Sequence, residues 1–195
     1  MSLELLLASA SPRRKELLQQ LGLDFQQKAV EVDETPYKSE PPHDYVMRMA
    51  YMKAEAAWQK WGNPDCLVLS SDTTVVIDNN ILGKPSDYDE FKSMMDLLSE
   101  RRHQVLTSVV VKSDREIKSV LSETQVYFRG LTDSDVEWYW HTGEPLDKAG
   151  GYGIQGLGAR FVSRIDGSYS GVVGLPLFET AEILFNFGIL SNNKA

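Results

Sequence analysis

Two basic and two acidic segments of the sequence contain the residue types that phosphate chemistry requires. The first basic segment combines the hydroxyl groups of Ser9 and Ser11 with the guanidinium groups of Arg13 and Arg14. Because Ser11 is a favourable N-cap and Pro12 fits the first helical position, we expect a helix to begin here. The free N–H groups and the dipole at a helix start bind anions, and guanidinium groups add charge-assisted donors. The segment favours a phosphate site, although a capped helix with two solvated arginines has the same pattern.

The acidic residues lie at two places that are far apart in the sequence. Asp72, followed by Thr73, interrupts an apolar run that otherwise predicts a strand. A carboxylate at such a point is unfavourable unless it meets a metal, a cation or hydrogen-bond donors. Asp33 and Glu34 follow a second predicted strand, where ordinary solvation of a loop also explains them. If the fold brings these carboxylates together, they can bind Mg²⁺ with substrate phosphates or act as a general base toward water.

Two lysines could add positive charge to the same site. Lys53 falls on the apolar face of a predicted helix, in register with Ala50 and Ala57. Lysine is rarely buried without a partner, so Lys53 either extends from the edge of the helix into solvent or faces a polar cleft. Lys84 lies in a Gly-Lys-Pro turn, where a lysine is most often only solvated.

A glycine-rich segment, residues 147–156, contains Gln155. Glycines let the backbone approach a ligand closely, although a tight connection also uses them. Residues 151–156 formally match the dinucleotide-binding fingerprint, but they follow no clear strand and lead into a predicted strand, so we reject that interpretation. The sequence has no Walker A motif, Tyr169 stands where a nucleophile elbow needs serine, and the three histidines are too dispersed to indicate a zinc site.

Alternating strands and helices are expected to position these residues. Hydrophobic periodicity and turn signals predict strands at residues 3–8, 25–32, 66–71 with 74–78 (one strand interrupted near Asp72), 105–111, 118–128 and 160–165. They predict helices at residues 11–22, 44–61, 87–100, 132–141 and 176–187, and loops at 33–42 and 143–158. This order is typical of an α/β protein with a mixed sheet. No linker divides the chain, so we expect residues 1–195 to form a single domain.

Composition and charge exclude several classes of function. The 195 residues are 42% hydrophobic and 25% charged, as in ordinary folded proteins. The net charge of −8 argues against a nucleic-acid-binding protein, because affinity for a polyanion requires many lysines and arginines. A small anionic ligand remains compatible with this charge, because a few local cations suffice to bind it.

The sequence also bears on location and assembly. The N-terminal residues have neither a basic start nor a long apolar stretch, and no segment approaches the roughly 20 apolar residues of a membrane span. The single Cys66 excludes an internal disulfide and fits a reducing compartment. We therefore expect a cytoplasmic protein with no membrane partner. The four tryptophans could support a homodimer, although core packing explains most of them.

Taken in order along the chain, these motifs resemble the Maf family of nucleotide pyrophosphatases. The resemblance rests on residues 9–14, 32–34, Lys53, 71–73, 83–85, 151–156 and 174–176, which span nearly the whole chain. It implies an elongated α/β fold with two lobes around a central cleft, similar to the inosine triphosphate pyrophosphatase architecture. It also implies hydrolysis between the α and β phosphates of a nucleoside triphosphate, with a divalent cation, Mg²⁺ or Mn²⁺.

The resemblance implies roles for individual residues. It makes Asp72 the proton acceptor, and it assigns Glu34, Lys53 and Lys84 to catalysis or to holding the substrate. Glu34, together with Asp72, is expected to bind the metal. All of these positions match the family pattern.

The remaining matches indicate the substrate. Ser9 and Arg13 match the loop that contacts phosphate. Arg14, Thr73 and Gln155 follow the branch of the family directed to dTTP and UTP, whereas the 7-methyl-GTP branch typically has tryptophan, glutamine and glutamate at these points. An amide can donate to and accept from a uracil-type edge. We therefore expect a dTTP/UTP pyrophosphatase with a house-cleaning role. The alternative is a non-catalytic nucleotide-binding regulator of cell division, because the family was first linked to septum formation.

Overall fold

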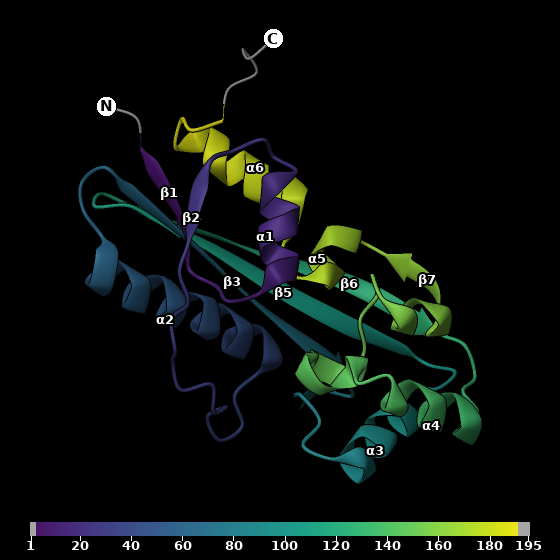
Figure 1. The fold of residues 1–195 in the computed structure, drawn as a ribbon. Coiled ribbons are helices and arrows are strands. Elements are labelled where there is room, and N and C mark those ends of the chain that lie inside the picture. Colours follow the sequence, from purple (N-terminus) through teal and green to yellow (C-terminus); the bar gives the residue numbers. More distant parts are fainter. Residues whose placement is uncertain (1–2, 191–195) are drawn as a thin grey trace.

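A seven-stranded mixed β-sheet forms the centre of the molecule in a computed structural model that describes residues 3–190 (Figure 1). The strand order is β2-β1-β3-β5-β6-β7, and β4 pairs with β3 outside this path. β1 is parallel to β2 and β3, whereas the other pairings are antiparallel. The strands are β1 Glu4–Leu7, β2 Phe25–Gln27, β3 Cys66–Ile77, β4 Asn80–Leu82, β5 Arg102–Lys112, β6 Ile117–Phe128 and β7 Val162–Asp166. The predicted α/β class with a mixed sheet is confirmed.

Helices cover both faces of this sheet and divide the molecule into two lobes. α2 lies along one face, and α1 and α6 lie on the other face beside β1 and β2, where they form the first lobe (Figure 1). α3, α4 and three short 3-10 helices surround the far end of β3, β5 and β6 and form the second lobe (Figure 1). The bounds are α1 Pro12–Gln19, α2 Pro42–Trp61, α3 Tyr88–Leu98, α4 Asp133–His141, η1 Glu144–Asp147, η2 Ala149–Gly151, η3 Leu157–Phe161, α5 Tyr169–Val173 and α6 Leu177–Asn186.

Strand β3 belongs to both lobes, and one of its edges is open where they meet. β1 pairs with β3 over residues 66–69, and β4 pairs with it over residues 75–77. Within residues 3–190, no strand borders residues 70–74 on that edge. Side chains alternate between the faces of a strand, so this open stretch presents polar groups to both sides of the sheet.

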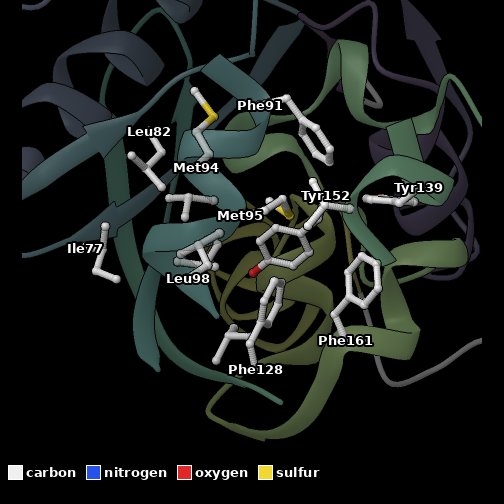
Figure 2. Close-up of a cluster of buried hydrophobic side chains, with 14 residues drawn as sticks. Ile77, Leu82, Phe91, Met94, Met95, Leu98, Phe128, Tyr139, Tyr152 and Phe161 are labelled. Carbon is white, nitrogen blue, oxygen red and sulfur yellow. The ribbon is translucent and has the colours of Figure 1, made fainter. Parts of the chain in front are cut away.

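Each lobe has its own apolar core. Leucines and valines of β1, β3 and β5 pack with α1 and α6 in the first lobe. Aromatic side chains dominate the second, where Phe91 of α3 and Tyr139 of α4 meet Phe128, Tyr152 and Phe161 (Figure 2). Ring centroids in this cluster lie 4.8–6.1 Å apart, a range in which aromatic pairs stabilise a core beyond the area that they bury. The cluster anchors the glycine-rich segment, because Tyr152 belongs to it.

Several predicted strands differ from those observed; β5, for example, begins at Arg102 instead of residue 105. β3 is continuous, and Asp72 is paired in register with Ser108, so the predicted interruption is wrong. What changes near Asp72 is the neighbouring strand on the other edge, which is β1 before it and β4 after it. The predicted strand 25–32 ends at Gln27, because its neighbour β1 ends at Leu7, whose carbonyl accepts from the Lys28 amide at 3.0 Å. The last strand begins at Val162 instead of residue 160, because Phe161 ends a 3-10 helix and enters the core.

The helices and loops also differ in detail from the prediction. The loop predicted at residues 143–158 contains three short 3-10 helices, and the five-residue helix α5, capped by the Ser168 side chain, was not predicted. Trp58, Trp61 and Trp140 pack against the cores, whereas Trp138 is more exposed. None of the helices within residues 3–190 has the length and apolar character that a membrane crossing requires.

Candidate active site

A cleft of about 670 Å³ lies between the two lobes, at the open edge of β3. It brings together most of the positions that the sequence singled out for the site: Ser9, Arg13, Arg14, Glu34, Lys53, Asp72, Thr73, Lys84 and Gln155. Asp33, the other acidic candidate, does not line the cleft; it is exposed, and its carboxylate accepts from the Thr35 amide at 2.9 Å. These residues come from the start of α1, the loop before α2, α2 itself, β3, the turn after β4 and the glycine-rich segment. The fold therefore gathers positions that are up to 146 residues apart, from Ser9 to Gln155, around one space.

An ion-paired triad forms the acidic part of the cleft. The Lys53 ammonium lies 2.6 Å from a carboxylate oxygen of Asp72 and 2.6 Å from one of Glu34. The side chains of Lys53 and Asp72 are only 12% and 11% exposed, whereas that of Glu34 is 52% exposed. Lys53 thus faces the cleft and does not extend into solvent. Ser70 and Asp72 point to the same face of β3, and the Ser70 hydroxyl donates to Ala50 of α2, which holds Lys53 above Asp72.

Arg14 occupies the opposite face of β3. Its guanidinium donates to the Gly174 carbonyl at 2.9 Å and to the Thr73 hydroxyl at 3.2 Å. The Ser71 hydroxyl donates to the same Gly174 carbonyl at 2.9 Å. Gly174 has a φ of +131°, which disfavours other residues and turns its carbonyl into the site. The 174–176 motif therefore serves to fix Arg14 and β3 to each other.

The remaining cations lie at the rim and link the lobes. Arg13 of α1 contacts Asp147 of the second lobe at 3.4 Å. Ser11 caps α1 by accepting from the Arg14 amide, as the sequence predicted. Lys84 is exposed in the turn after β4, and the carbonyl of the preceding Gly83 accepts from the Gly150 amide at 2.9 Å. This bond connects the Lys84 turn to the glycine-rich segment.

Comparison with known proteins identifies the family. Residues 4–187 match the family described as Maf-like protein. The chain belongs to the Maf family. It is 52% identical to a dTTP/UTP pyrophosphatase of Vibrio parahaemolyticus, over 95% of this chain and 98% of the relative, and 52% identical to one of Pseudoalteromonas translucida, over 93% and 95%. Among solved structures, the Staphylococcus aureus Ham1 protein matches with a TM-score of 0.48 and 15% identity over 64% of this chain and 71% of its own.

Burial and charge set the protonation of the acidic residues in this Maf cleft. Burial raises the pKa of Asp72 above its usual value, and the nearby Lys53 and Arg14 offset only part of that effect. Burial also acts on Glu34, but the hydrogen bond and charge of Lys53 outweigh it and lower the pKa of Glu34. A carboxylate whose pKa lies above its usual value is a stronger base than ordinary aspartate, which suits Asp72 to accept a proton.

Tyr45 and Lys148 are among the cleft residues to which the sequence assigned no role. Tyr45 of α2 donates from its hydroxyl to the Glu34 carbonyl at 3.0 Å, and burial together with the charges of Asp72 and Glu34 raises its pKa to about 12. Lys148 pairs with Asp147 at 2.6 Å and lines the cleft floor. Tyr45 carried no sequence signal, because it contacts a backbone atom of a loop. Lys148 belongs to the glycine-rich segment that drew attention to Gln155.

The donor set is compatible with a divalent cation. Glu34 and Asp72 accept from one ammonium, so their oxygens converge on the position of a single positive charge. Two carboxylates with phosphate oxygens from a substrate are a donor set that Mg²⁺ commonly uses. Within residues 3–190, no group of three or more His, Cys, Asp or Glu side chains could hold a metal alone. The residues thus fit a cation that binds together with the substrate.

Proposed function

We propose that this chain hydrolyses dTTP and UTP to the monophosphate and pyrophosphate with the help of a divalent cation. The principal support is the buried Asp72–Lys53 pair, which places a base of raised pKa beside a cation in a cleft lined by four further basic side chains. The names of relatives that are about half identical over nearly their full length support the substrates. Residues 1–195 act as one domain in this proposal.

Asp72 orients a water molecule and accepts one of its protons as the water oxygen attacks the α-phosphorus. The bond between the α-phosphorus and the bridging oxygen breaks, and that oxygen leaves with pyrophosphate. Ser9 and Arg13 bind phosphate oxygens, and Lys53 and Lys84 stabilise the negative charge that develops in the transition state. Glu34 and Asp72 would hold Mg²⁺ or Mn²⁺, which supplies charge neutralisation at the phosphates.

The nucleobase of the substrate is selected on the other side of the cleft. Arg14 and Thr73 are hydrogen-bonded to each other, and Gln155 lies across the cleft on the glycine-rich segment. In this proposal the Gln155 amide pairs with the uracil-type edge, to which it both donates and accepts. The activity would remove excess or non-standard pyrimidine nucleotides before they are incorporated.

Analysis of the products tests this function. With Mg²⁺, the purified chain should release pyrophosphate and the monophosphate from dTTP and UTP faster than from purine nucleotides, and a chelator should stop the reaction. Release of orthophosphate and a diphosphate would contradict cleavage at the α–β bond. Binding of nucleotides without turnover, across a panel of metals and nucleotides, would instead favour the non-catalytic regulator.

Replacement of Gln155 by glutamate tests how the nucleobase is selected. Gln155→Glu removes the amide donor and adds a charge, so the ratio of kcat/KM for dTTP to that for dGTP should fall by about tenfold or more. Gln26→Glu, the same change at an exposed position of β2, is the matched control and should leave the ratio unchanged. An unaltered ratio in Gln155→Glu would refute the selective role of this residue.

A further inference from the structure

The carboxylate of Glu144 lies behind the segment that carries Gln155. Glu144 begins η1, and its Oε2 accepts from the Leu157 amide at 2.8 Å. Its Oε1 accepts from the Gly158 amide at 3.1 Å and from the Tyr139 hydroxyl at 2.7 Å. One side chain therefore holds two successive backbone N–H groups that follow Gln155 closely.

Tyr139 extends this support to the other side of Gln155. Its hydroxyl donates to Glu144 and accepts from the Gly153 amide at 3.1 Å. The Tyr139 ring is fully buried in the aromatic core of the second lobe, so the hydroxyl has a fixed position (Figure 2). The backbone is thus anchored two residues before and two residues after Gln155.

The two glycines that follow Gln155 closely are explained by close approach to the same two side chains. A Cβ added at Gly156 would lie 2.5 Å from both carboxylate oxygens of Glu144. A Cβ added at Gly158 would lie 2.6 Å from the Tyr139 hydroxyl oxygen. Gly156, the last glycine of the sequence that imitates a dinucleotide-binding fingerprint, therefore accommodates a carboxylate of the protein itself, and Gly158 accommodates a phenol.

Glu144 acts on this segment as an ionised acceptor. Burial acts to raise its pKa, but the hydrogen bonds from Leu157, Tyr139 and Gly158 outweigh it, and the pKa is lowered below the usual value. Lys148 donates to the Glu144 backbone carbonyl at 2.7 Å, and its ion pair is with Asp147. The carboxylate is therefore bound to loop amides and a phenol.

We propose that Glu144, together with Tyr139, is a positioning residue. It sets the preference of the cleft for one nucleobase over another by fixing the position of Gln155. This inference rests on the proposed role of Gln155 in base selection. Glu144 does not itself line the cleft, so it acts through the backbone of residues 153–158. A residue that recognises a base through two hydrogen bonds needs a fixed backbone, because discrimination between bases depends on their geometry.

Glu144→Gln separates the hydrogen-bond pattern from the shape of the side chain. If the amide oxygen of the new glutamine replaces Oε1, its NH₂ group faces the Leu157 N–H, and two donors meet without an acceptor. The opposite orientation places the NH₂ group against the Gly158 N–H. Either way the segment must shift, although the volume of the side chain is unchanged.

Equilibrium binding of dTMP and dGMP tests the inference, because it requires no turnover. The wild-type chain should bind dTMP more tightly than dGMP. Glu144→Gln should reduce the ratio of the dissociation constant for dGMP to that for dTMP by about tenfold, the effect of a lost hydrogen bond to a charged group. Glu137→Gln, the same change at an exposed position of α4, should leave the ratio unchanged. In a Gln155→Ala background, Glu144→Gln should change the ratio no further.

The outcomes distinguish this inference from the proposed function. A folded Glu144→Gln variant with the wild-type ratio, or a wild-type chain without preference between the two monophosphates, would overturn the inference. Failure to release pyrophosphate would overturn the proposed function even if the binding preference held. If Glu144→Gln does not fold, Tyr139→Phe provides the test, because it keeps the ring in the core and removes the hydroxyl that links Glu144 to the Gly153 amide. It should lower the ratio by a smaller factor.

Discussion

Asp72→Asn is expected to lower the rate of pyrophosphate release from dTTP by at least about a thousandfold, within the range for loss of a general base. Asparagine has nearly the shape of aspartate, and its amide oxygen can still accept from Lys53, but it accepts no proton from water at neutral pH. The KM should change less than kcat, because Arg13 and Lys84 still bind the phosphates. The measurement is steady-state release of pyrophosphate at saturating Mg²⁺.

The fold should survive this substitution. In wild type, burial disfavours the charged form of Asp72, and the Lys53 ion pair offsets only part of that effect. Asparagine removes both effects, so we expect the free energy of unfolding to change by only about 1 kcal/mol. Asp78→Asn is the matched control, since Asp78 follows the same strand and pairs with Arg101 outside the cleft. A folded Asp72→Asn variant with near wild-type turnover would show that another group is the base.

The chemistry of the site could be predicted from the sequence because it depends on residue type. Lys53 on an apolar helix face and Asp72 in an apolar strand are each unfavourable alone, and the structure pairs them at 2.6 Å. The sequence did not predict why Asp72 faces the cleft. The open edge of β3 depends on where β1 and β4 each end, at Leu7 and Leu82, which is a property of strand pairing.

The limits of sequence reasoning are clearest where a side chain acts on a backbone atom. Tyr45 binds the Glu34 carbonyl, and Glu144 binds the amides of Leu157 and Gly158. Neither contact leaves a residue pattern, because every non-proline residue offers the same backbone groups. The glycines at 156 and 158 did signal a close approach, but the sequence could not show that the neighbours were Glu144 and Tyr139 instead of a ligand. Element types were predictable from periodicity, whereas the ends of β2 and β7 depended on tertiary neighbours.

Lys53→Met is expected to lower kcat for dTTP by about a hundredfold to a thousandfold, as for loss of one preorganised charge in an active site. Methionine retains most of the length and packing of lysine, so the change removes mainly the ammonium. Lys112→Met is the matched control. Lys112 is similarly buried and pairs with the half-exposed Glu55 outside the cleft, so this variant should keep wild-type turnover. Equal losses of activity in both variants would mean that Lys53 acts only through stability.

Lys53→Met should also destabilise the chain, and the loss should grow with pH. Removing one partner of a buried pair costs about 3 kcal/mol, whereas the Lys112 control should lose less because Glu55 remains solvated.

The pKa of Asp72 is raised in the folded state, so its ionisation lowers stability as pH rises from the unfolded pKa to the folded one. Without Lys53 that pKa rises further, and Glu34 loses the partner that lowers its own pKa and stabilises the fold at higher pH. Denaturant unfolding in metal-free buffer should therefore show a larger difference from wild type near about pH 8 than near about pH 5. A difference that is independent of pH would contradict the ion-paired triad, because a purely steric effect of methionine has no titrating group.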